Sequence, residues 1–361
     1  MNVLAVGNNQ FILNNLHSYT QGYKDINFFN VKSISQLTIQ LKKADVIILC
    51  FNPDRASEKK YVHKVIQFCK EIRSIKNKIP IIYLSEYLNQ NYSNLKLKPG
   101  EKILFDLFNL TKNPITIIRT PVIFGKWCEL SNSDLSRIIC KKINKNSSLL
   151  KKKKKENMIH IEDLINLIIK EINFLKKGFN FKIPNPIYSF TLKDVYKKII
   201  FFKKNLSTIN ILKVGNGFER ALYSTFISYL SPAYFKKKLV SHKDKRGEFI
   251  ELIKTEDSGQ FSFFSIRPGY VRGEHFHNTK FEKFLVVEGN IEFKFQHLLK
   301  KKIYKVYSNS ENLNVINTIP GWIHSLKNIG KTKALLFVWS NEVFDIKNPD
   351  TIFKKIIHEK A

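Results

Sequence analysis

The chain has 361 residues, 43% of them hydrophobic and 13% aromatic, so it can fold into two globular domains with cores of ordinary size. Its formal charge of +31 suggests nucleic acid, but the lysines are spread along the whole chain without a platform of aromatic residues, and we expect no nucleic-acid binding. No apolar run of about eighteen residues, no signal peptide and no CxxC pair is present. We therefore expect a cytoplasmic protein with reduced cysteines and no membrane span.

The first half of the chain alternates between apolar and amphipathic segments. Apolar segments typical of strands cover residues 2–7, 26–31, 45–51, 79–85 and 114–125. Segments with helical spacing of apolar residues cover residues 10–19, 34–44, 57–75, 99–108 and 158–172. This alternation predicts βαβ units and an α/β fold with a doubly wound parallel sheet.

The second half changes character twice. After residue 172 the pattern loosens into helices and loops, and near Ser241 short strands begin to alternate with turns that contain glycine or proline. Many short strands at regular spacing predict an all-β barrel or a double-sheet jelly roll. We therefore expect two domains, residues 1–240 and 241–361.

The β domain carries the strongest motif. The stretch "GYVRGEHFHNTKFEKFLVVEG" contains His275, His277 and Glu282, and His324 follows a Pro-Gly turn further along. Alternation in a strand places the first two histidines on one face, and three imidazoles with one carboxylate suit zinc, iron, manganese or nickel. This spacing is the signature of cupin barrels. The competing interpretations are hydrogen-bonded core histidines, or a metal site from which His277 stands aside as a base.

The first strand leads into part of a dinucleotide-binding turn. Gly7 takes the place of the glycine that makes the tight turn, but Gln10 and Leu13 replace the two glycines that follow it. Gln10 would project into the phosphate path, and Leu13 would push the helix away from the sheet. Lys32 is the candidate partner for a 2′-phosphate, with an incidental lysine as the alternative. The sequence thus predicts a cofactor-type fold with a degenerate fingerprint.

Several longer segments resemble a known family. "HKDKRGEFIELIKTEDSGQFSFFSIRPGYVRGEHFHNTKFEKFLVVEGNIEFKF" and the preceding "ALYSTFISYL" closely resemble the C-terminal part of the CapF family of bifunctional capsular-polysaccharide enzymes. In the first half, "RTPVIFGKWC" and "IHIEDLINLI" resemble segments of the reductase domain of that family. The resemblance implies a Rossmann-like extended short-chain reductase domain, a metal-binding cupin domain and a homodimer.

The same resemblance implies a two-step reaction on a UDP-linked 4-keto-6-deoxy-N-acetylhexosamine. The cupin domain epimerises carbon 3, and the reductase domain then reduces the carbon 4 ketone with NADPH. A divalent metal, with zinc as our first choice, would stabilise the enediolate that forms on loss of the carbon 3 proton. Lys280, Arg272 and His277 are candidates for the base or for an electrostatic partner, and a solvated side chain is the alternative for Lys280.

A reductase of this family needs a tyrosine and a lysine four residues apart on a helix, where the tyrosine donates a proton to the carbonyl. Tyr92 and Lys96 have this spacing, and Ser85 or Glu86 takes the position of the usual serine. Because a proline inside a helix costs ~3 kcal/mol, we expect the helix to begin at Pro99, which leaves the pair before it.

Two other functions compete with the bifunctional enzyme. One is a cupin epimerase or isomerase of sugar nucleotides, whose first domain is a non-catalytic scaffold or a dimer-forming module. The other is a ligand-binding protein in which both sites have decayed, and the metal signature argues against it.

Overall fold

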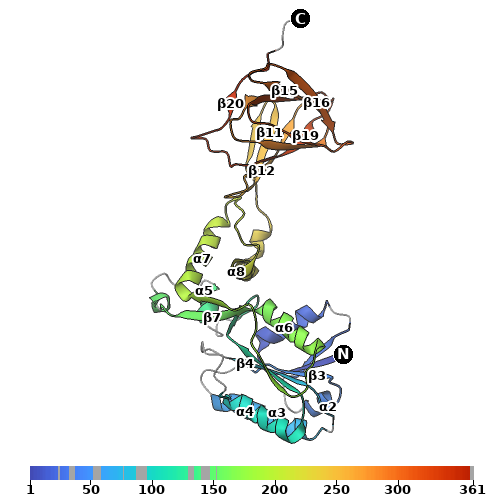
Figure 1. Cartoon of the computed structure of the whole chain (residues 1–361), viewed down its shortest axis with the longest axis vertical. Coiled ribbons are helices and arrows are strands. Elements are labelled where there is room, and N and C mark those ends of the chain that lie inside the picture. Colours follow the sequence, from blue (N-terminus) through green and yellow to red (C-terminus); the bar gives the residue numbers. More distant parts are fainter. Residues whose placement is uncertain are drawn as a thin grey trace. The chain divides into compact units, whose positions relative to one another are not determined.

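The computed structural model describes residues 1–22, 25–31, 37–51, 58–75, 77–86, 96–128, 134–139, 147–151 and 153–357. They form two compact units, drawn in Figure 1 with the chain coloured from blue to red. The first unit comprises Met1–Phe202 and Val214–Ser231, and the second comprises Lys203–Lys213 and Pro232–Ala361.

The first unit contains a six-stranded parallel sheet, which confirms the predicted α/β fold. In spatial order its strands are β2 (Asn27–Val31), β1 (Asn2–Val6), β3 (Val46–Leu49), β4 (Ile81–Glu86), β5 (Ile115–Thr120) and β8 (Phe179–Lys182). Every neighbouring pair is parallel. The strand order reverses between β1 and β3, and doubly wound sheets bind their ligands beyond the carboxyl ends of the strands at such a point.

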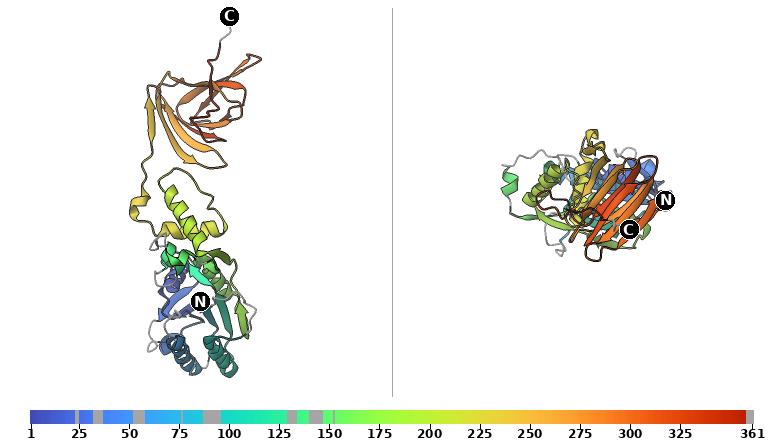
Figure 2. Two further views of the ribbon diagram at one scale, coloured as in Figure 1. Left: turned by 90° about the vertical axis from the view of Figure 1, so that its left-hand side faces the viewer. Right: turned by 90° about the horizontal axis from the view of Figure 1, so that it is seen from above.

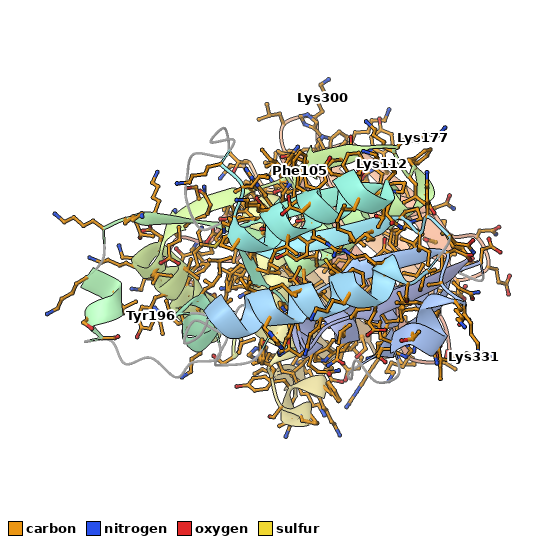
Figure 3. All side chains as sticks on the ribbon, turned by 90° about the horizontal axis from the view of Figure 1, so that it is seen from below. Phe105, Lys112, Lys177, Tyr196, Lys300 and Lys331 are labelled. Carbon is orange, nitrogen blue, oxygen red and sulfur yellow. The ribbon has the colours of Figure 1, made fainter. Side chains whose placement is uncertain are left out.

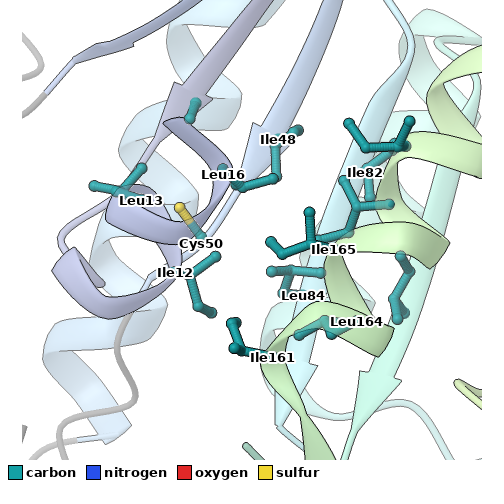
Figure 4. Close-up of a cluster of buried hydrophobic side chains, with 14 of the residues drawn as sticks. Ile12, Leu13, Leu16, Ile48, Cys50, Ile82, Leu84, Ile161, Leu164 and Ile165 are labelled. Carbon is teal, nitrogen blue, oxygen red and sulfur yellow. The ribbon is translucent and has the colours of Figure 1, made fainter. Parts of the chain in front are cut away.

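Helices cover both faces of this sheet. α1 (Gln10–Thr20) and α6 (Ile161–Asn173) pack on one face, where their side chains meet those of β1, β3 and β4 in the cluster of Figure 4. α2 (Leu37–Leu41), α3 (Glu58–Arg73) and α4 (Pro99–Thr111) supply the core of the opposite face. Because both faces are covered, all four residues of β3 are buried, and the strand appears in the sequence as a continuous apolar run.

The structure corrects the sequence interpretation in three places. Residues 158–160 belong to a strand and not to the helix that follows them, which begins at Ile161. Residues 114–125 form two strands, because Pro121 has no amide N–H to continue the ladder. β6 (Val122–Phe124) instead joins a second sheet with β7 (Lys155–His160) and β9 (Tyr188–Thr191). The region expected to hold only helices and loops contains β8 and β9, which at four residues each are too short to show a period.

The other helical elements are α5 (Asp134–Ile139), η2 (Ser148–Lys151), α7 (Leu192–Asn205), α8 (Gly217–Ser228) and η3 (Pro232–Phe235).

The second unit is a double-sheet β fold, as the short strands predict. One sheet has the order β10 (Ser241–Asp244), β11 (Gly247–Lys254), β12 (Gln260–Ile266), β19 (Ala334–Ser340), β14 (Glu282–Glu288) and β17 (Val315–Asn317). The other has the order β16 (Ile303–Asn309), β15 (Asn290–His297), β18 (Trp322–Asn328), β13 (Val271–Phe276) and β20 (Ile352–Phe353). Figure 2 shows the two sheets packed on each other. Their core includes Phe264, Phe284 and Phe293. This is the cupin jelly roll.

The surface and the cysteines agree with the composition. Lysine side chains extend outward from both units, and Lys112, Lys177, Lys300 and Lys331 are labelled in Figure 3. Cys50 and Cys69 are free thiols, and burial raises the pKa of each to about 12, so neither forms a reactive thiolate. Within the described ranges, no helix is long and apolar enough to cross a membrane.

Candidate functional site

The second unit brings the four predicted metal ligands together. One ligand atom from each of His275, His277, Glu282 and His324 lies within 4.8 Å of the others. His275 on β13 pairs with His324 on β18, His277 follows the end of β13, and Glu282 begins β14. A bulge with Glu274 at φ 58° interrupts the strand pairing between Gly273 and His275. The local geometry therefore depends on an irregular strand.

The hydrogen bonding of these side chains fits a metal ion. Nδ1 of His277 bonds to the backbone carbonyl of Asp350, so this nitrogen carries the proton and Nε2 is left as an electron-pair donor. Nε2 of His277 and of His324 lies 3.4 Å and 3.3 Å from Glu282 Oε2. Neither nitrogen has a hydrogen-bond partner among the described residues, nor does Nδ1 of His275. Buried nitrogens without partners are rare in folded proteins, and a cation between the two Nε2 atoms and the Glu282 carboxylate would satisfy both of them.

The protonation states also suit metal binding. Burial, with a further contribution from His324, lowers the pKa of His275 to about 3. Burial acts to raise the pKa of Glu282, but the adjacent His277 and His324 outweigh it and hold that pKa below its ordinary value. At neutral pH the imidazole of His275 is therefore neutral and the carboxyl of Glu282 is ionised, which are the forms that coordinate a metal.

The cluster opens into a cavity of about 230 Å³. His275, Glu282 and His324 form part of its wall, Phe249, Phe264 and Phe284 supply apolar surface, and Arg246 and Arg272 supply positive charge. Lys280 is not among the described residues that line it: its side chain is 5% exposed, and its Nζ lies 5.6 Å from the centre of the Phe344 ring. The alternative of a solvated lysine is therefore wrong, because this side chain is buried.

The C-terminal segment contacts the loop and strand that carry two of the candidate metal ligands. The carboxylate of Asp350 accepts hydrogen bonds from the backbone N–H of Asn278, Thr279 and Lys280 at 2.7–3.0 Å. Burial acts to raise the pKa of Asp350, but these three N–H groups hold it well below its usual range. Three residues later, Phe353 pairs with His275 through β20. Asp350 therefore fixes the loop that carries His277.

We expect Asp350→Ala to weaken metal binding by about 10-fold, because the loop loses its anchor while all four ligands remain. The measurement is the metal dissociation constant by competition with a chelator. Asp345→Ala is the matched control, since the Asp345 carboxylate on the same segment accepts a hydrogen bond only from a nearby backbone N–H, that of Lys347. Equal affinities for the two variants would show that the anchor plays no part in metal binding.

In the first unit, Gly7 is the one glycine of the dinucleotide-binding turn that is present. Gly7 has φ 152°, and a Cβ there would lie 2.2 Å from the carbonyl oxygen of Cys50, so the tight turn requires glycine. Gln10 Nε2 donates to Asn14 Oδ1 at 2.6 Å, and Leu13 is 2% exposed within the core cluster. The sheet and α1 thus accommodate Leu13 by packing it, contrary to the expectation that it would push the helix away. Lys32 lies outside the described residues.

The structure describes some, but not all, of the residues predicted for the reductase site. α4 begins at Pro99, as predicted, with Lys98 as its N-cap. Lys96 is exposed and precedes the helix, whereas Tyr92 lies outside the described residues. Ser85 near the end of β4 is buried, and its hydroxyl donates to Glu101 Oε1 at 2.8 Å. The helix that starts at Pro99 therefore does not contain Lys96.

A buried ion pair lies beside Ser85. Arg119 on β5 donates to both oxygens of Glu101, from Nε at 3.0 Å and from Nη2 at 2.7 Å. Glu101 is fully buried, Arg119 is 4% exposed, and the guanidinium lies 4.5 Å from the centre of the Phe181 ring. This pair connects the first turn of α4 to the carboxyl ends of β4 and β5.

The comparisons with known proteins identify the family. The family of the polysaccharide biosynthesis C-terminal domain matches residues 242–352. The chain is 31% identical over 370 residues to the UDP-2-acetamido-2,6-beta-L-arabino-hexul-4-ose reductase of Pseudomonas aeruginosa, over 97% of this chain and 98% of that protein. The capsular polysaccharide assembling protein CapF of Staphylococcus aureus has a solved structure that matches with a TM-score of 0.86 and 28% identity, over 99% of this chain and 100% of that one. The chain belongs to the CapF family.

CapF-family membership covers both units, since these two relatives match the chain almost from end to end. A third relative matches only a part: the spore coat polysaccharide biosynthesis protein SpsL of Bacillus subtilis is 25% identical over 124 residues, 32% of this chain and 82% of that protein. Members of the family are enzymes of surface polysaccharide biosynthesis.

The sequence analysis did not predict several residues that lie beside the His/Glu cluster of the second unit or beside Ser85 in the first unit. Asp350 lies far along the chain from the histidine motif and belongs to no motif of its own. Arg119 is one basic residue within an apolar strand, and nothing in its neighbourhood predicts a partner. Arg246 and Asp244 did stand within the segment that carries the CapF resemblance, in "DKRG", and a charged turn ahead of a cupin strand was the signal available.

Proposed function

We propose that this CapF-family chain converts a UDP-linked 4-keto-6-deoxy-N-acetylhexosamine in two steps. Residues 241–361 epimerise carbon 3, and residues 1–240 reduce the carbon 4 ketone with NADPH. The observation that carries the proposal is the His/Glu cluster, with its unpartnered buried nitrogens, in the wall of a cavity that also carries two arginines. The relative from Pseudomonas aeruginosa is named as a reductase of a UDP-linked 4-keto sugar, which supports the second step.

For the epimerisation, the ketone at carbon 4 acidifies the proton on carbon 3. A bound divalent metal, with zinc as our choice, would act as a Lewis acid toward the ketone oxygen. Arg272 is always protonated and lines the cavity, so its part is electrostatic stabilisation of the enediolate rather than proton abstraction. The hydrogen bond of His277 Nδ1 to Asp350 favours the role of ligand for His277 over that of base. The position of Lys280 outside the cavity wall speaks against it as the base.

For the reduction, Gly7 begins the turn that would face the NADPH pyrophosphate, with Lys32 for the 2′-phosphate. Tyr92 would donate the proton to the carbonyl oxygen, and Lys96 would lower the pKa of that tyrosine. Ser85, held by Glu101, would orient the substrate. The missing glycines and the start of α4 at Pro99 favour the alternative, an epimerase whose first unit is not catalytic. We propose a cytoplasmic homodimer as its setting.

The two functions are separated by one experiment in D₂O. The UDP-4-keto sugar is incubated with the metal-loaded protein, with and without NADPH, and deuterium at carbon 3 is followed by NMR. We expect exchange without NADPH, and NADPH oxidation that falls by about 100-fold or more in Tyr92→Phe.

Tyr234→Phe is the control, because Tyr234 and Lys238 repeat the same spacing elsewhere in the chain. Exchange without any NADPH oxidation would leave the epimerase alternative. If neither exchange nor oxidation occurs, both enzymatic functions are wrong.

A further inference from the structure

A charged hairpin turn forms one wall of the cupin cavity. Arg246 lies in the turn between β10 and β11, and its Nε and Nη2 donate to Asp244 Oδ2 at 2.9 Å and 2.6 Å. Asp244 Oδ1 accepts from the backbone N–H of Arg246 at 2.8 Å. Hydrogen bonds from Arg246 lower the pKa of Asp244 to about 2, so the carboxylate is charged at neutral pH. The guanidinium of Arg246 is therefore held in one orientation.

A second arginine reaches the same carboxylate from another strand. Arg272 on β13 places Nη2 3.4 Å from Asp244 Oδ1 and donates from Nε to the carbonyl of Ser265 at 3.2 Å. Its side chain is 14% exposed and its guanidinium lies 5.7 Å from the centre of the Phe264 ring. One aspartate thus orients two arginines, and both line the cavity.

The two arginines of this wall share a single carboxylate. Asp244 is the counter-charge for both, because the other carboxylate at the cavity, Glu282, belongs to the His/Glu cluster. The two guanidinium groups therefore exceed the Asp244 carboxylate by one positive charge, and Arg272 is half-buried, where a charge without a counter-ion is costly. Each guanidinium has five N–H donors, and their Nη1 groups have no hydrogen-bond partner among the residues that the structure describes. An anion bound beside these two arginines would use both the excess charge and the free donors.

The choice of residue points to a phosphate group. The chain has 61 basic residues, of which eight are arginines, yet the basic side chains in the described wall of this cavity are both arginines. Arginine presents a rigid fork that binds phosphate oxygens in pairs, which the lysine ammonium does not. A surface that only needed positive charge would, in this chain, carry lysine.

We propose that Arg246 and Arg272, clamped by Asp244, bind the diphosphate of a nucleoside-diphosphate sugar while its sugar ring lies at the His/Glu cluster. The inference rests on the proposed function, because it supposes that the cupin cavity receives the nucleotide sugar. It adds a binding subsite, and with it a reason why this cavity would take the diphosphate-linked sugar in preference to the free sugar.

The test uses the full-length, metal-loaded chain and the variant Arg246→Gln, with UDP as the probe. We expect the KM of carbon 3 exchange to rise by about 10- to 100-fold, and kcat to change less than KM. The inhibition constant of UDP against this exchange should rise by about the same factor as KM. By equilibrium dialysis, the number of UDP molecules bound per chain falls by one. Lys245→Gln, which removes the same charge from the neighbouring exposed residue, should leave all three values unchanged.

The two proposals fail in different ways. If Arg246→Gln matches Lys245→Gln within twofold in KM, in UDP inhibition and in UDP stoichiometry, the subsite is wrong while the epimerase can stand. If the wild type shows no exchange, the proposed function is wrong, and the dialysis experiment still decides the subsite. Asp244→Asn is the second variant: it leaves both arginines but removes their clamp, and it should give an intermediate loss of UDP binding.

Discussion

His275→Ala is expected to reduce metal affinity by at least about 100-fold and to lower carbon 3 exchange by about 100- to 1000-fold. The reason is that His275 is one of four donors that lie within 4.8 Å of one another, and its loss would leave a metal ion with only three of them. Metal content after dialysis, measured by elemental analysis beside the wild type, is the direct readout and does not depend on activity.

The matched control for this variant is His242→Ala, since His242 is an exposed histidine on β10 of the same unit. Its metal content should equal that of the wild type. Unchanged metal content in His275→Ala would refute the ligand assignment and restore the interpretation of the cluster as core histidines.

Glu101→Ala is expected to destabilise the first unit by about 3–5 kcal/mol, because it leaves the charge of Arg119 buried without this carboxylate. Glu101 is fully buried, and its two oxygens accept from Arg119 and from Ser85. Hydrogen exchange of the β4 and β5 amides, measured at increasing urea concentrations, gives the free energy of opening of this unit in the full-length chain.

Glu162→Ala provides the comparison, because Glu162 pairs with Lys126 in the same unit while both side chains are about one-third exposed. Partly solvated pairs contribute about 0–1 kcal/mol, so this variant should change the opening free energy little. Similar effects from the two variants would mean that the Glu101–Arg119 pair is not a major stabilising contact.

The sequence by itself determined the fold classes and the metal motif. The pattern of apolar residues along a segment is a local property, so the short apolar run Val46–Leu49 predicted a buried strand. Likewise, proline cannot continue a helix from the turn before it, and this placed the start of α4 at Pro99. His275 and Glu282 lie close enough in the chain for strand geometry and spacing to predict that they converge.

Only the tertiary structure decided which distant side chains meet. Asp350 supports the loop of His277 across 73 residues of chain, and Arg272 shares Asp244 with Arg246 because β13 and the β10–β11 turn lie at one cavity. Such contacts depend on the register and packing of whole strands, which no local period encodes. The same holds at the degenerate glycine turn, where the sequence predicted that Leu13 would displace α1. The packed core shows that the fold keeps a leucine there by burying it between helix and sheet.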